Sequence, residues 1–159
     1  ATAFVLCALA APAPLAAQGI GLAQLQAGVA FTNDALENDA LLGGRAALGF
    51  RSGRFVFGPE AGYYGLGAEA HLTTVDAFVR YGARTSTGWY GVGGLGYQGP
   101  GTASGGRSIF GAGIGAGWAG GTATASGPSA ELRYLFSLQN DTEGQSGFLL
   151  LTVGWEFRW

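Results

Sequence analysis

The sequence predicts an all-β chain, namely an eight-stranded antiparallel up-and-down transmembrane β-barrel that is preceded by a cleavable signal peptide. Three observations support this fold class. Apolar and polar residues alternate with a period of two over eight segments. The charged residues inside these segments lie on the parity opposite to the apolar set. Glycine is abundant, with 31 residues, while proline is scarce, with 5, as in β chains with many close backbone approaches.

The first 17 residues differ from the rest of the chain. They are apolar and end in small residues, which is typical of the h-region and cleavage zone of a secretory signal peptide. Pro12 and Pro14 argue against a buried helix. We therefore expect 1–17 to be an N-terminally truncated signal peptide, cleaved after Ala17 or one residue earlier, and 18–159 to form the barrel.

Eight strands follow from the alternation. They are predicted, in order, over 24–32, 42–51, 55–64, 73–83, 89–98, 108–118, 128–137 and 149–159. Each has about the 9 to 11 residues that a membrane-crossing strand needs. Tight turns such as SGR alternate with long loops such as TNDALENDA. An even strand number with short turns at one end and long loops at the other is typical of outer-membrane barrels.

Each strand is defined by its apolar positions. In the first four strands these are Leu25, Ala27, Val29 and Phe31; Gly44, Ala46, Leu48 and Phe50; Phe55, Phe57, Pro59, Ala61 and Tyr63; and Val75, Ala77, Val79 and Tyr81. In the last four they are Trp89, Leu95 and Tyr97; Phe110, Ala112, Ile114, Ala116 and Trp118; Ala130, Leu132, Tyr134 and Phe136; and Leu149, Leu151, Val153, Trp155, Phe157 and Trp159. Glycines blur the parity of the fifth strand alone.

The apolar face indicates contact with lipid. Aromatic residues lie at the strand ends and small aliphatic residues between them, as in the sixth strand, where Phe110 and Trp118 flank Ile114. This is the pattern of an apolar band between aromatic girdles. A soluble lipocalin-like barrel with its apolar face inside would show the same alternation. The signal peptide, the girdles and the aromatic last strand favour the membrane barrel.

The opposite face carries a set of charged residues that we expect to fill the barrel interior. Its predicted members are Arg45, Glu60, Asp76, Arg80, Glu131, Arg133 and Glu156, with Arg51 and Arg158 nearer the periplasmic rim. Buried charges must be paired, and arginine suits planar pairing with carboxylates. A structural polar core is the first interpretation. A gated ion path is the second, because the inward glycines of the sixth strand would leave room for water.

Other motifs do not support catalysis or cofactor binding. GVGGLG matches a dinucleotide fingerprint but lacks the helix that should follow it. The chain has no lysine for a phosphate-binding loop, and its single Cys7 permits no cysteine metal site. A net charge of −2 argues against nucleic acid. We expect no cofactor, no metal and no enzyme activity.

Two weaker candidates remain. His71 with Thr73 and Glu69 is the one conceivable catalytic group of a lipid-modifying enzyme, but we interpret His71 as a solvated loop residue. The acidic segment NDALEND could bind calcium through its oxygens, although a solvated loop is the default interpretation.

The chain resembles the small outer-membrane β-barrel family of the OmpA transmembrane domain, OmpX and the opacity-like proteins. The resemblance spans 18–159 and is strongest in FRSGRFVFGPEAGYYG, WYGVGGLGYQG, SAELRYLF and LLLTVGWEFRW. It implies that the last strand carries the recognition signal for the barrel-assembly machinery. The residues that match this signal are Leu151, Val153, Trp155, Phe157 and Trp159, although the family usually ends in Phe.

The expected function is that of an integral outer-membrane barrel with a structural or surface-interaction role through its long loops. The alternatives are a narrow porin-like pore and, less favoured, a lipid A-modifying enzyme. The expected partners are outer-membrane lipids and lipopolysaccharide, the assembly machinery and periplasmic chaperones, and the expected state is a monomer. Membership of so diverse a family does not identify a specific activity.

Overall fold

The computed structural model describes residues 21–32, 40–65, 69–82, 88–102, 105–106, 108–121, 126–139 and 147–159. Its strands are β1 (Gly21–Thr32), β2 (Ala40–Ser52), β3 (Phe55–Tyr64), β4 (His71–Gly82), β5 (Gly88–Thr102), β6 (Gly105–Gly106), β7 (Ile109–Ala119), β8 (Gly127–Ser137) and β9 (Gly147–Arg158). The predicted signal peptide lies outside the described residues. Within them, no helix is long and apolar enough to cross a membrane.

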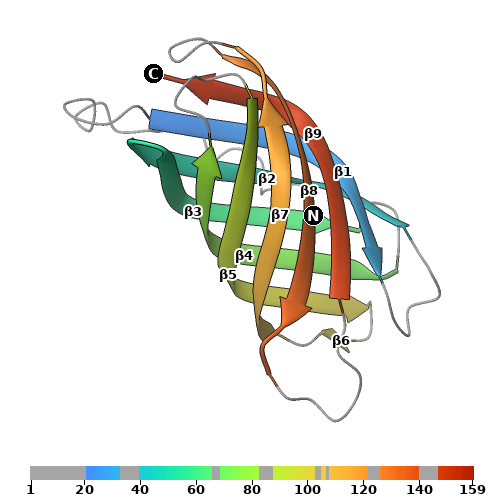
Figure 1. Cartoon of the computed structure of the whole chain (residues 1–159). Helices are drawn as coiled ribbons and strands as arrows, with labels where there is room; N and C mark the ends of the chain where they lie inside the picture. Colours follow the sequence, from blue (N-terminus) through green and yellow to red (C-terminus); the bar gives the residue numbers. More distant parts are fainter. Residues whose placement is uncertain are drawn as a thin grey trace.

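The strands close into a barrel of eight long antiparallel strands (Figure 1). Each strand pairs with its neighbours along the chain, and β4 pairs directly with β5. The closing pair joins β1 to β9, from Leu22 opposite Arg158 to Thr32 opposite Phe148. The short β6 pairs only with the end of β5 and adds no strand to the wall. The predicted fold class is confirmed, as is the predicted pairing of the last strand with the first.

The strand ends follow local backbone chemistry. The β2–β3 turn contains Gly53 at a φ of +61°, a left-handed conformation that glycine adopts without steric cost. β5 runs four residues beyond its predicted end, and its Gly101 pairs with His71 at the start of β4. The prediction that His71 lies in a loop is therefore wrong. Glycine and proline in GPGT masked a strand whose backbone still pairs.

The β2–β3 ladder is interrupted once. Gly43–Ala47 pair with Glu60–Tyr64, and Phe50–Ser52 pair with Phe55–Phe57, but the register skips Leu48 and Gly49. Their counterparts would be Gly58 and Pro59. Proline has no backbone N–H, so it cannot donate to the strand beside it. The other seven long-strand ladders run without a gap over their paired residues.

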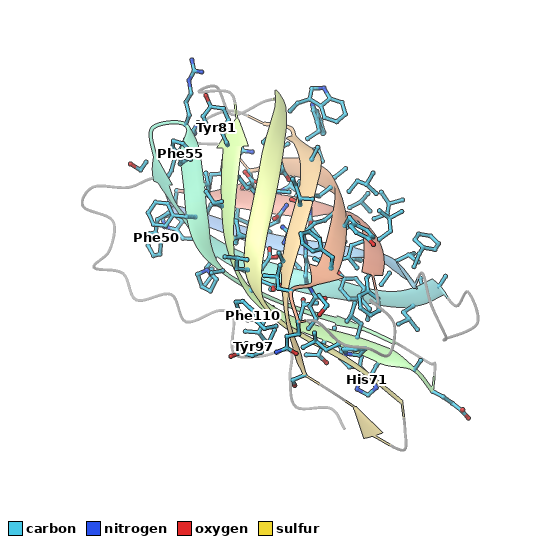
Figure 2. All side chains as sticks on the ribbon, turned by 60° about the horizontal axis from the view of Figure 1, so that its bottom comes forward. Phe50, Phe55, His71, Tyr81, Tyr97 and Phe110 are labelled. Atoms are coloured by element: carbon cyan, nitrogen blue, oxygen red, sulfur yellow. The ribbon has the colours of Figure 1, made fainter. Side chains whose placement is uncertain are left out.

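Side chains alternate between the two faces of the wall as the sequence predicts. On β4, Leu72, Thr74, Asp76, Phe78 and Arg80 are buried, whereas the residues between them are exposed. The exposed face is apolar. Aromatic residues gather at both barrel ends, and Figure 2 shows Phe55 with Tyr81 at one end and Tyr97 with Phe110 at the other. Val75, Leu95, Ile114 and Val153 lie between these ends and are all more than half exposed. Such a surface is unfavourable in water and suits lipid.

Candidate functional site in the barrel interior

The barrel interior contains a continuous ion-pair network. The structure places all seven predicted residues of this set inside, each at most 7% exposed. Alternation on β2, β3, β4, β8 and β9 directs them inward, because each lies on the parity opposite to the exposed apolar residues. Burial of so many charges is tolerable only where they are paired.

Glu131 on β8 is the centre of this network. Its carboxylate forms an ion pair with Arg45, lies 3.4 Å from Arg80, and lies 2.7 Å from Arg133. Tyr90 also donates a hydrogen bond to it, at 2.8 Å. One carboxylate is therefore paired with three arginines on β2, β4 and β8, and these ion pairs connect separate parts of the wall.

Two further carboxylates extend the network along the barrel axis. Glu60 forms ion pairs with Arg133 and, at 3.6 Å, with Arg45. Glu156 binds Arg80 at 3.0 Å and Arg158 at 2.5 Å. The contacts thus run from Glu60 on β3 to Arg158 at the end of β9, at the barrel end that carries the short turns.

Asp76 differs from the other acidic members. It is buried and lies opposite Glu60 in the β3–β4 register. Among the ion pairs between described residues, none includes Asp76. The structure therefore places it beside the network, where its nearest carboxylate neighbour along the register is Glu60.

Neutral polar residues, which a search for charges does not reveal, complete the network. Gln26 accepts hydrogen bonds from Arg45 Nε at 2.7 Å and from Thr152 at 2.8 Å. Gln24 and Gln26 both donate to Ser129, at 3.0 and 3.1 Å. The sequence signal that points to both glutamines is their alternation with the outward residues of β1.

Two inward glycines of β7 lie against large side chains. A Cβ on Gly113 would lie 2.7 Å from Leu135 Cδ2 and 3.1 Å from Arg133 Cδ. A Cβ on Gly117 would collide with the ring of Tyr90. These glycines therefore accommodate large side chains that cross the interior from neighbouring strands. Tyr90 also shows which residues of β5 face inward, because its own hydroxyl reaches Glu131 in the interior.

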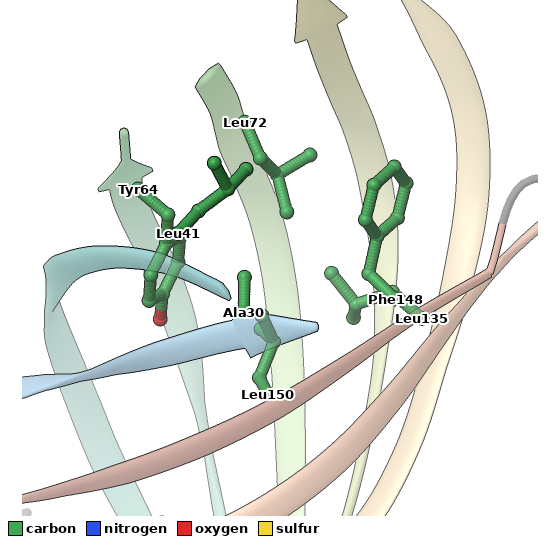
Figure 3. Close-up of a cluster of buried hydrophobic side chains, with 7 residues drawn as sticks. All are labelled: Ala30, Leu41, Tyr64, Leu72, Leu135, Phe148 and Leu150. Carbon is green, nitrogen blue, oxygen red and sulfur yellow. The ribbon is translucent and has the colours of Figure 1, made fainter. Parts of the chain in front are cut away.

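An apolar layer covers the network at the end of the barrel that carries the long loops. Figure 3 shows its seven buried side chains, which are Ala30, Leu41, Tyr64, Leu72, Leu135, Phe148 and Leu150. They come from six of the eight long strands. The interior is thus polar through its middle and apolar beneath the loops.

The weaker candidates gain no site. His71 stacks on Tyr63 with ring centroids 6.0 Å apart, and among the described residues no hydrogen bond or ion pair links it to Glu69 or Thr73. No group of three or more potential metal ligands occurs in the described part of the chain. The acidic segment NDALEND lies outside the described residues.

The sequence matches no known family model and no curated protein. Its structure is similar to several solved β-barrels. Neisserial surface protein A (NspA) is 15% identical with a TM-score of 0.70, over 89% of this chain and all of that one. The N-terminal β-barrel domain of Pseudomonas aeruginosa OprF is 20% identical with a TM-score of 0.59, over 89% and 100%.

The attachment invasion locus protein Ail of Yersinia pestis is 15% identical with a TM-score of 0.54, over 86% of this chain and 99% of that one. The chain therefore has the fold of the small eight-stranded outer-membrane β-barrels of Gram-negative bacteria. The resemblance stated from the sequence is confirmed at the level of the fold.

Proposed function

We propose that this chain is an integral protein of the Gram-negative outer membrane whose barrel is a closed scaffold and whose long loops contact partners outside the cell. The apolar layer carries the proposal. An ion that entered from the loop end would have to pass Leu41, Leu72, Phe148 and their neighbours, all of which are at most 3% exposed. Dehydrating an ion in such surroundings is costly.

The ion-pair network supports the same role. Ion pairs between its charged side chains connect β2, β3, β4, β8 and β9, so few of these charges are left to attract a permeating ion. An eight-stranded barrel has an interior just wide enough for side chains to fill. The network then acts as the polar core of the barrel.

The loops are the proposed site of interaction. Two of the similar structures are a surface protein and an attachment protein by name, which supports a surface role here. The proposed surroundings are outer-membrane lipids and lipopolysaccharide, and the proposed state is a monomer without catalytic activity. If the chain were instead a lipid-modifying enzyme, His71→Ala would abolish a modified lipid product in cells.

The outward residues of β9 are the proposed contact for periplasmic chaperones and the assembly machinery. Leu151, Val153, Trp155, Phe157 and Trp159 are all exposed along one face of the chain's last strand. Trp159 also exchanges two backbone hydrogen bonds with Gly21, at 2.8 and 3.2 Å, where the barrel closes. A recognition signal on this strand would be accessible before the barrel closes. Once the barrel has closed, the same strand is paired with β1.

Planar-bilayer recording of the purified barrel tests the closed scaffold against the pore. We expect no single-channel currents from the wild type. The double variant Phe148→Ala/Leu150→Ala, which removes two side chains of the apolar layer, serves as the matched comparison and should conduct more than the wild type. Reproducible wild-type channels that disappear in Glu131→Gln would instead establish the narrow pore.

A further inference from the structure

The turn between β2 and β3 carries an arginine on the outer rim of the barrel. Four of the other arginines in the described residues, at 45, 80, 133 and 158, are buried in the interior, and Arg51 lies on the inward parity of β2. Arg54 is exposed. None of the ion pairs between described residues involves its guanidinium. This cation is therefore available to a ligand outside the barrel.

Its position is fixed by neighbours on β4. The Arg54 carbonyl accepts a hydrogen bond from the N–H of Gly82 at 3.2 Å. The Arg54 Nη1 atom lies 3.5 Å from the Tyr81 hydroxyl and is directed to donate to it. Because that hydroxyl accepts from Arg54, its own proton remains available to donate. A guanidinium and a phenol hydroxyl are thus neighbours on the rim, and both can donate to a ligand.

An aromatic surface lies directly beside these donors. The rings of Phe55 and Tyr81 are 5.1 Å apart and tilted by 48°, and Figure 2 shows both at one end of the barrel. Toward the middle of the wall, the next outward pair is Phe57 opposite Val79. From the rim toward the middle of the wall, the exposed groups are therefore a cation and a hydroxyl, then aromatic rings, then apolar side chains.

The tryptophans show where this site lies in the membrane. All four, at 89, 118, 155 and 159, are exposed and lie at the end with the short turns. Tryptophan prefers the boundary between headgroups and acyl chains. In outer-membrane barrels the short turns face the periplasm. Arg54 and Tyr81 then lie at the headgroup level of the periplasmic leaflet.

We propose that Arg54, Phe55 and Tyr81 form a binding site for a phospholipid of the periplasmic leaflet, and we name it the Arg54 site. This inference rests on the proposed outer-membrane location. The guanidinium and the Tyr81 hydroxyl bind the headgroup phosphate, for which arginine is well suited. The rings of Phe55 and Tyr81 contact the glycerol region, and Phe57 with Val79 contact an acyl chain.

Native mass spectrometry of the purified full chain in detergent micelles tests this site. The probes are phosphatidylglycerol and a diacylglycerol with the same acyl chains but no phosphate. We expect Arg54→Gln to weaken phosphatidylglycerol retention about tenfold and Tyr81→Phe about threefold, with diacylglycerol retention unchanged. Arg54→Lys should restore part of the loss, because lysine keeps the charge without the planar donors.

Arg51→Gln is the matched control, since it removes an arginine from the same hairpin but from the inward parity. It should retain phosphatidylglycerol as the wild type does. Equal retention by the wild type and Arg54→Gln would overturn the site, as would an equal loss of both probes. So would an Arg54-dependent preference for lipopolysaccharide over phosphatidylglycerol, which would place the ligand in the opposite leaflet.

Insertion of every variant into phospholipid vesicles, followed by a heat-dependent gel shift, separates this inference from the proposed function. If the wild type inserts and shifts but its phospholipid retention is independent of Arg54, the Arg54 site alone is wrong. If the wild type does not insert, the outer-membrane location is wrong and the site falls with it.

Discussion

Arg133 on β8 donates from both terminal nitrogens of its guanidinium to the carboxylate of Glu60 on β3. Three strands, β2, β1 and β9, separate β3 from β8 around the wall, so this pair crosses the interior. The same guanidinium also donates to Glu131 at 2.7 and 3.0 Å. Arg133 therefore links two carboxylates across the barrel.

Removing the negative charge of Glu60 should destabilise the barrel strongly. Glu60→Gln leaves Arg133 and Arg45 without one of their carboxylates in a buried setting, and breaking one side of a buried pair costs about 3 to 5 kcal/mol. Urea unfolding in phospholipid vesicles measures this free energy. Glu60→Met/Arg133→Met, which removes both charges, should cost less than Glu60→Gln. A loss below about 1 kcal/mol for the single variant would show that the pair is not structural.

Restoring a backbone donor at Pro59 should strengthen the β2–β3 ladder. Pro59→Ala supplies an N–H where the register skips Leu48, in a wall that faces lipid. An unpaired backbone group in lipid costs several kcal/mol. Replacing proline raises the conformational entropy of the unfolded chain, which lowers the unfolding free energy by up to about 1 kcal/mol. We expect a net gain of about 1 to 3 kcal/mol in vesicles.

Hydrogen exchange provides the local test of that prediction, because the amide introduced by Pro59→Ala should be protected as strongly as its neighbours on β3. Pro128→Ala is the matched control. Pro128 also faces outward, but its backbone faces β7 at the end of that ladder, where Gly120 already donates to its carbonyl and water can reach a new N–H, so the substitution should bring little gain. Rapid exchange of the introduced amide would show that the strands are not close enough to pair there.

The sequence predicted the barrel better than it predicted the contents of the interior. A period of two fixes which face each residue occupies, so the eight strands and the inward charges followed from alternation alone. It does not fix which inward groups meet across the barrel. Arg133 and Glu60 lie 73 positions apart and touch only because the wall closes. The partners of Glu131 depend on the stagger of the strands, which local sequence does not specify.

Two differences between the sequence prediction and the structure have identifiable physical causes. The sequence predicts a loop at His71 because the small residues of GLGAEA precede it, although the backbone of Gly101 pairs with it. Alternation does not predict the apolar layer, because Leu41, Leu72 and Leu150 lie on the parity that carries charges farther along the same strands. Apolar residues on the inward face predict such a layer only when the stagger of the strands is known, because the stagger decides whether they lie at the same depth in the barrel.

A charge on the outer wall should test the lipid contact. Val153 on β9 is 59% exposed and lies between the aromatic ends. Val153→Arg should reduce the unfolding free energy in vesicles by about 2 to 4 kcal/mol, since arginine near the midplane of the bilayer is costly. Ser52→Arg, at the exposed end of β2, should cost at most about 1 kcal/mol. Equal tolerance of both substitutions would indicate that water surrounds the wall.

The ring of Tyr90 should make Gly117 intolerant of any larger residue. The ring occupies the position that a Cβ on Gly117 would take, and its hydroxyl donates to Glu131 at 2.8 Å. Gly117→Val should displace Tyr90, remove that hydrogen bond and cost about 1 to 3 kcal/mol by overpacking. Gly93→Ala is the control on the outer face of β5. Its Cβ would meet nothing closer than 3.8 Å, so its unfolding free energy in vesicles should match the wild type. The double variant Gly117→Val/Tyr90→Ala should recover part of the loss from overpacking, because it vacates the space that valine needs. If Tyr90→Ala does not relieve Gly117→Val, the two residues do not share that space, and the interior of β5 and β7 is packed differently.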